Sequence, residues 1–146
     1  MSVVKSSLCA VVMSLIAAPV ARAEVVTIRE DRGGPVVTYI DHVAQLSKSG
    51  AEVRIEGLCL SACTLYLGAK NICIGEEAKL GFHGPASAFG GFPLPKPEFE
   101  RLTKQMARHY PKPLRDWFMS TARYELTDYY VVTGAEAIRM GVKRCA

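Results

Sequence analysis

The stretch Gly57-Leu-Cys-Leu-Ser61-Ala62 joins a predicted strand to a predicted helix, and the predicted fold is built around this junction. The β-branched residues of 51–56 predict the strand, and the composition of 61–68 predicts a short helix. A hydroxyl at the start of a helix lies beside backbone N–H groups that have no partner within the helix. Two interpretations follow: Ser61 is a helix N-cap, or it is a nucleophile whose oxyanion those N–H groups stabilise.

Strands and helices alternate on both sides of this junction. Runs rich in β-branched and apolar residues predict four strands, at residues 25–29, 51–56, 71–74 and 78–82. Helical spacing predicts helices at residues 36–49, 61–68, 98–109 and 114–123, and one from the capping box Thr133-Gly-Ala-Glu136 to Gly141. This alternation predicts an α/β fold, in a single domain with a mainly parallel sheet.

Two further signals lie at the same predicted edge of the sheet. Gly33-Gly34 follows the first strand, and two glycines allow a tight turn that directs the Gly34 N–H into the crevice at the strand ends. His83 follows the fourth strand, where an imidazole is placed to act as general base for a serine. An ordinary turn and a structural histidine are the alternatives. The next segment, residues 86–97 with Phe89 and Phe92, is typical of a loop that contacts a substrate or partner.

The N-terminal segment predicts export. Residues 1–23 contain Lys5, an uncharged apolar run over residues 8–18 and the small-x-small sequence Ala21-Arg22-Ala23, which is the pattern of a cleaved signal peptide. The apolar run is shorter than the about 20 residues that a membrane-spanning helix needs. We therefore expect a mature domain over residues 24–146, periplasmic or secreted, without a stable membrane anchor.

Four cysteines remain in that domain: Cys59, Cys63, Cys73 and Cys145. An even number of cysteines in an exported domain predicts two disulfides, with three pairings open. The spacing of Cys59 and Cys63 also allows a zinc site, although the other two are unevenly separated and we expect no metal. Removal of Lys5 and Arg22 with the signal peptide lowers the formal net charge from +4 to +2, which is too small and too scattered to indicate nucleic acid or an anionic membrane as partner. No basic cluster suits the phosphates of coenzyme A, and we expect no cofactor.

In chain order, Gly33-Gly34, Gly57-x-x-x-Ser61-Ala62 and Gly81-Phe82-His83-Gly84-Pro85 resemble the motifs of the Clp protease subunit (ClpP) and the wider Clp/crotonase-like superfamily. The chain is most similar to small exported Clp-like proteins of bacteria, which carry the Cys-x-Ser-Ala-Cys segment found at residues 59–63. The resemblance covers residues 25–142. It implies a stack of repeated ββα units and assembly of several copies into rings or trimers.

The resemblance also implies roles for individual residues. Ser61 corresponds to the nucleophile and His83 to the general base. The second glycine of the turn and the residue after the nucleophile supply the oxyanion hole, which places these roles on the N–H groups of Gly34 and Ala62.

Two departures from the family pattern matter. The turn reads Asp31-Arg32-Gly33-Gly34 and lacks the Ser-Pro pair of the family. The family's acidic residue falls at Tyr129 when counted back from the capping box, so Asp128, one residue earlier, is the expected acid. If Asp128 does not reach His83, a Ser–His dyad or no catalysis remains.

The sequence thus leads to two hypotheses. The first is an exported serine hydrolase that cleaves peptides or small esters without ATP, through Ser61, His83 and Asp128. The second is a non-catalytic binding or scaffold protein that keeps the fold, because Cys59 and Cys63 crowd Ser61 and the acid is misplaced. Fold alone does not decide between them.

Overall fold

The central strand of the protein is β2 (Glu52–Leu60), which pairs with three other strands in a computed structural model that describes residues 23–87 and 92–146. Strand β1 (Val25–Asp31) runs along one side of β2. On the other side, β3 (Asn71–Ile74) pairs with the first half of β2 and β4 (Lys79–Phe82) with the second half. All three pairings are parallel, and β5 (Tyr130–Thr133) adds to β4 as an antiparallel edge strand.

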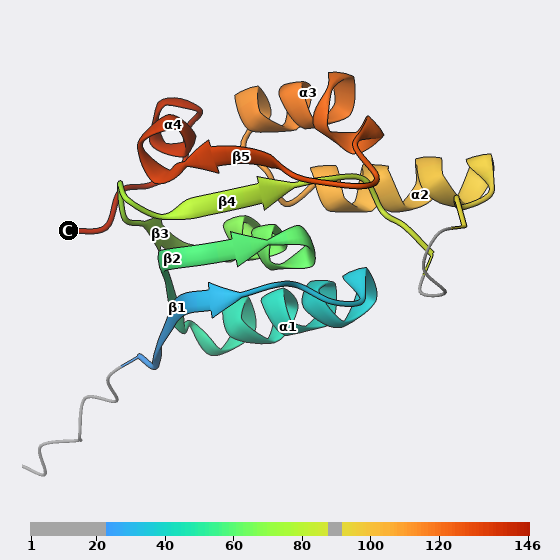
Figure 1. Ribbon diagram of the computed structural model, residues 1–146. Helices are drawn as coiled ribbons and strands as arrows, with labels where there is room; N and C mark the ends of the chain where they lie inside the picture. Colours follow the sequence, from blue (N-terminus) through green and yellow to red (C-terminus); the bar gives the residue numbers. More distant parts are fainter. Residues whose placement is uncertain (1–22, 88–91) are drawn as a thin grey trace, which may run out of the picture.

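The helices cover this sheet and close one apolar core. Figure 1 shows α1 along the β1 side of the sheet and α3 along the β5 side. The helical elements are α1 (Val36–Ser49), the 3₁₀ helix η1 (Ser61–Gly68), α2 (Lys96–Ala107), α3 (Lys112–Ser120), the 3₁₀ turn η2 (Ala122–Tyr124) and α4 (Gly134–Arg139). The largest fully buried apolar side chains are Phe82, Phe118, Ile55, Leu65, Ile74, Leu80, Leu114 and Val53. Mixed α/β architecture, one domain and a mostly parallel sheet are therefore confirmed.

Gly57 does not end its strand as the sequence predicts. Strand β2 continues through it to Leu60, and Ser61 follows directly. A side chain at Gly57 would place its Cβ 2.0 Å from the carbonyl oxygen of Arg29, where the β1–β2 register shifts. Between Ile55 and Leu58, β2 has one residue more than the part of β1 that it faces, so Gly57 lies in a bulge of its own strand instead of ending it.

The C-terminal part also differs in detail from the prediction. The helix expected over residues 114–123 ends at Ser120, and a separate 3₁₀ turn follows. Strand β5 was not predicted. The capping box at the start of α4 is confirmed, because Thr133 Oγ1 accepts a hydrogen bond from the Glu136 N–H and the Glu136 carboxylate accepts one from the Thr133 N–H.

The four cysteines form two disulfides, Cys59–Cys63 and Cys73–Cys145. The second ties the C-terminal segment to β3, where Ile74 also exchanges two backbone hydrogen bonds with Lys143 and Cys145. The disulfide prediction is confirmed, and the structure supplies the pairing that the sequence left open. Disulfides of this kind fit a protein outside the cytoplasm. Within the described ranges, no helix is both long and apolar enough to cross a bilayer.

The predicted signal peptide, apart from Ala23, and Phe89 lie outside the described residues.

Removing the two disulfides should destabilise the protein unequally. The Cys73–Cys145 link spans 72 positions of the chain and the Cys59–Cys63 link spans 4. In the chain-entropy description the longer loop contributes about 4 kcal/mol and the shorter about 2 kcal/mol to the free energy of unfolding. Urea unfolding of the double alanine variant of each pair measures this difference. Equal losses, or a larger loss for the short loop, would contradict it.

Candidate functional site

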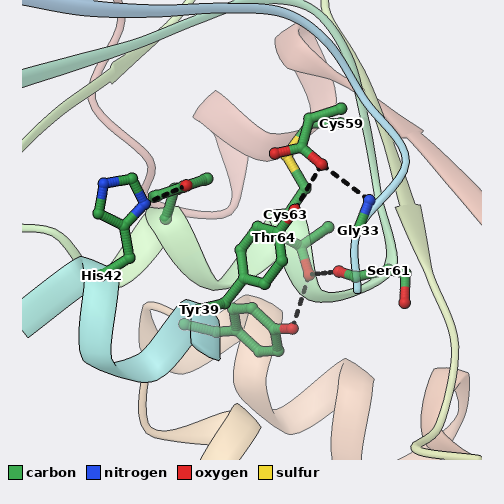
Figure 2. The surroundings of a disulfide bond; sticks show 10 residues. Gly33, Tyr39, His42, Cys59, Ser61, Cys63 and Thr64 are labelled. Carbon is green, nitrogen blue, oxygen red and sulfur yellow. Dashed lines mark hydrogen bonds between the residues drawn. A yellow bond between two sulfur atoms is a disulfide. The ribbon is translucent and has the colours of Figure 1, made fainter. Parts of the chain in front are cut away.

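Ser61 lies where β2 ends and η1 begins. Its backbone φ is 57°, in the left-handed region that residues other than glycine seldom adopt. Such a conformation costs about 1–3 kcal/mol and persists only where the surrounding structure holds it. Here the fully buried Cys59 and Cys63 are covalently joined across the turn, as Figure 2 shows. The sharp turn at Ser61 is therefore held from both sides.

The Ser61 side chain does not cap the helix. The residue before η1 is Leu60, and no side chain makes a capping hydrogen bond there. Ser61 Oγ lies 2.7 Å from Nε2 of His83 instead. The N-cap interpretation of Ser61 is therefore wrong, and the hydroxyl faces an imidazole.

His83 reaches Ser61 because of the parallel pairing of β2 and β4. Leu60 is in register with Gly81, so both strands end at the same edge of the sheet. Ser61 directly follows the first strand, and His83 directly follows the second. Side chains at the carboxyl ends of adjacent parallel strands meet in this way in α/β folds.

Burial lowers the pKa of His83 below its ordinary value of 6.5. A hydrogen bond with the Gly84 backbone and the negative charge of Glu125 raise the pKa, but their effect is smaller than that of burial. The imidazole is therefore neutral at pH 7. A ring N–H that donates to the Gly84 carbonyl leaves Nε2 free to accept from the Ser61 hydroxyl, which is the tautomer a general base needs.

Asp128 does not orient His83 in this structure. Its carboxylate accepts a hydrogen bond from the Tyr129 N–H, and its own N–H donates to the Glu125 carboxylate. In the part of the chain that the structure describes, no hydrogen bond joins Asp128 to His83. Tyr129, which stands at the sequence position expected for the acid, packs its ring against His83, with the ring centroids 5.1 Å apart and the two planes at 78°. The geometry is that of a Ser–His pair packed against a tyrosine.

The glycine turn lies directly against Ser61. Gly33 has φ of 80°, and a Cβ there would lie 2.7 Å from Ser61 Cβ and 2.9 Å from the Ala62 nitrogen. Gly34 lines the same cavity as Ser61 and His83. The structure thus brings together Ser61, His83 and the two residues expected to supply oxyanion donors, and it leaves Asp128 apart.

Asp31 and Tyr39 hold the glycine turn in place. Asp31 Oδ1 accepts a hydrogen bond of 2.8 Å from the Gly33 N–H and one of 2.7 Å from the Tyr39 hydroxyl. Burial and the bond to Asp31 raise the pKa of Tyr39, so the hydroxyl remains a donor at neutral pH. We call Asp31 and Tyr39 the turn clamp. Sequence reasoning missed it, although Asp-x-Gly is the pattern of an Asx-turn.

A cavity of about 400 Å³ opens beside this pair, a size within the range of small-molecule sites. Its lining is Gly34, Pro35, Val36, Ser61, His83, Gly84, Pro85, Ala86, Ser87 and Met106. His83 is the one ionisable side chain among these lining residues, so the cavity suits an uncharged and mainly apolar group.

No protein-family model matches the chain, and no curated protein matches its sequence. Among the described residues, no group of three or more His, Cys, Asp or Glu side chains is arranged to hold a metal ion. The functional argument therefore depends on the geometry around Ser61.

The histidine should titrate below its ordinary pKa. We expect the NMR ring signals of His83 to move with a midpoint below 6.5 in the folded protein and near 6.5 in concentrated urea, where burial is lost. Because the unfolded state then binds the proton more tightly, stability falls as the pH drops from the unfolded pKa to the folded one. A folded midpoint at or above 6.5 would refute this.

The Tyr39→Phe variant tests the turn clamp. Losing the hydroxyl that donates to Asp31 should lower the free energy of unfolding by about 1 kcal/mol and speed hydrogen exchange of the Gly33 amide. The matched control is Tyr66→Phe, which loses a hydroxyl contact of the same length with His42. If both variants speed the exchange of Gly33 equally, the clamp does not hold the turn.

Proposed function

We propose that this protein is an exported serine hydrolase with a Clp/crotonase-like fold, which transfers the acyl group of a peptide or ester to water without ATP. The observation that carries the proposal is the 2.7 Å contact between Ser61 Oγ and His83 Nε2 at the wall of an apolar cavity. A serine with positive φ supports it, because strained backbone of this kind clusters at active sites. The two disulfides support a location outside the cytoplasm.

The chemistry follows from the neutral imidazole. His83 Nε2 takes the Ser61 proton as Oγ attacks the substrate carbonyl carbon, and the carbonyl oxygen becomes an oxyanion. In this mechanism the N–H groups of Gly34 and Ala62 stabilise that charge, a contribution of about 3–4 kcal/mol per donor in known hydrolases. His83 then gives its proton to the leaving group. Water attacks the acyl-serine by the same steps and releases the acid.

The order of the parts supports the proposed superfamily. The glycine turn follows β1, the serine follows β2 and the histidine follows β4, all at the carboxyl edge of parallel strands. The disulfide-closed segment from Cys59 to Cys63 corresponds to the Cys-x-Ser-Ala-Cys motif of the exported Clp-like proteins.

The second candidate function is a binding or scaffold role without catalysis. It is favoured by one observation: at the sequence position expected for the acid, the aromatic ring of Tyr129 packs against His83. A ligand would then occupy the same apolar cavity and leave unchanged.

Labelling with a fluorophosphonate probe distinguishes the two functions. The hydrolase should be labelled covalently at Ser61, and labelling should fall by at least about 1000-fold in Ser61→Ala and His83→Ala. Labelling of the wild type should decline at acidic pH, with a midpoint below 6.5 as His83 becomes protonated. Ser120→Ala is the control, because that exposed serine lies on α3 away from the cavity. An unlabelled wild type would favour the binding role.

A further inference from the structure

A second hollow adjoins the Ser61 cavity. It encloses about 230 Å³ and shares Pro85 and Ala86 with the first. Its other lining residues are Phe92, Pro93, Leu126 and Thr127. The two hollows therefore adjoin at the segment that directly follows His83.

The walls of the second hollow expose large apolar side chains. Phe92 is 72% exposed and Leu126 is 43% exposed. Exposing two such side chains beside a cavity is unfavourable in water and marks a binding surface. The lining of this hollow contains no ionisable side chain, so its ligand is apolar.

Leu126 is held rigidly at that position. The Glu125 carboxylate accepts hydrogen bonds from the N–H and hydroxyl of Thr127 and from the N–H of Asp128, all between 2.8 and 2.9 Å. The Glu125 carbonyl accepts a further bond of 2.8 Å from the N–H of Gly84. The turn that carries Leu126 is thus fixed to the residue that follows the catalytic histidine.

We propose that the two hollows together bind an ester with an unbranched apolar acyl chain that is long enough to extend beyond the Ser61 cavity. The ester carbonyl lies at Ser61, and the chain passes Pro85 and Ala86 to end against Leu126 and Phe92. We call the two adjoining hollows the groove. A peptide bound in the groove would need hydrogen-bond partners along its backbone. The polar side chain in the second hollow, Thr127, already donates its hydroxyl proton to Glu125.

This inference rests on the proposed function for its chemical step. Ser61 Oγ forms a bond to the acyl carbon, the ester C–O bond breaks, and the alcohol leaves with the proton that His83 took from Ser61. Water then supplies the oxygen and protons that yield the free fatty acid and restore Ser61. No oxidant or cofactor is needed.

Hydrolysis of p-nitrophenyl acetate, butyrate and octanoate tests the chain-length preference. Full burial of a methylene corresponds to about a fourfold gain, and a half-open groove gives less, so kcat/KM should rise at least about tenfold from butyrate to octanoate. In Leu126→Ser and Phe92→Ser the octanoate-to-acetate ratio should fall toward one. Val25→Ser, an exposed apolar position on β1, should keep the ratio of the wild type. The proposal is overturned if the octanoate-to-acetate ratio of kcat/KM is near one in the wild type. It is also overturned if Leu126→Ser and Phe92→Ser both keep the ratio of the wild type.

A binding measurement separates this inference from the proposed function. In the Ser61→Ala variant, sodium octanoate should shift the methyl NMR signals of Leu126, whereas sodium acetate should not. If octanoate binds but the wild type hydrolyses no ester, the proposed binding groove is supported and the proposed hydrolase function is contradicted. If esters are hydrolysed through Ser61 but octanoate leaves the Leu126 signals unmoved, the groove proposal fails alone.

Discussion

The parallel pairing of β2 with both β1 and β4 is the constraint on which the site depends. One strand brings three chain segments to the same edge, because the glycine turn follows β1, Ser61 follows β2 and His83 follows β4. The three segments are in close contact. Gly33 lies against the backbone on both sides of Ser61, and the Ser61 hydroxyl lies 2.7 Å from Nε2 of His83. A shift in either register would separate these groups.

Much of the fold could be predicted from sequence because its signals are local. The helix from Val36 has regular apolar spacing, and the capping box at Thr133 is a complete motif. Gly57 was misinterpreted because a glycine that forms a bulge within a strand gives the same sequence signal as a glycine that ends one. Strand β5 was missed because three of its four residues are exposed at a sheet edge, which gives no alternating pattern. The disulfide pairing depends on distances that only the folded chain sets.

The candidate site, like the fold, could be predicted only where its signals are local in the sequence. Ser61 and His83 were predicted as candidates because each follows a predicted strand, although the strand before Ser61 continues past Gly57 to Leu60. The acid could not be placed, because counting back from the capping box puts Tyr129 at the expected position and Asp128 one residue before it, and only the folded chain decides which side chain packs against His83. The turn clamp was missed for a similar reason, since Tyr39 reaches Asp31 only when α1 has packed beside the end of β1.

The absence of an orienting carboxylate on His83 in the described structure bears on the substrate. When His83 takes the serine proton, the imidazolium is stabilised by the Gly84 backbone and the more distant charge of Glu125, while burial opposes it. Without a carboxylate to stabilise the imidazolium, transfer of the Ser61 proton to His83 is less favourable, so we expect the pair to act best on the more reactive carbonyl substrates. An amide must expel an amine and depends fully on proton transfer from the imidazolium, whereas an ester expels an alkoxide more readily. We infer that the proposed Ser–His pair is better matched to esters than to peptides, in agreement with the ester proposed for the two hollows.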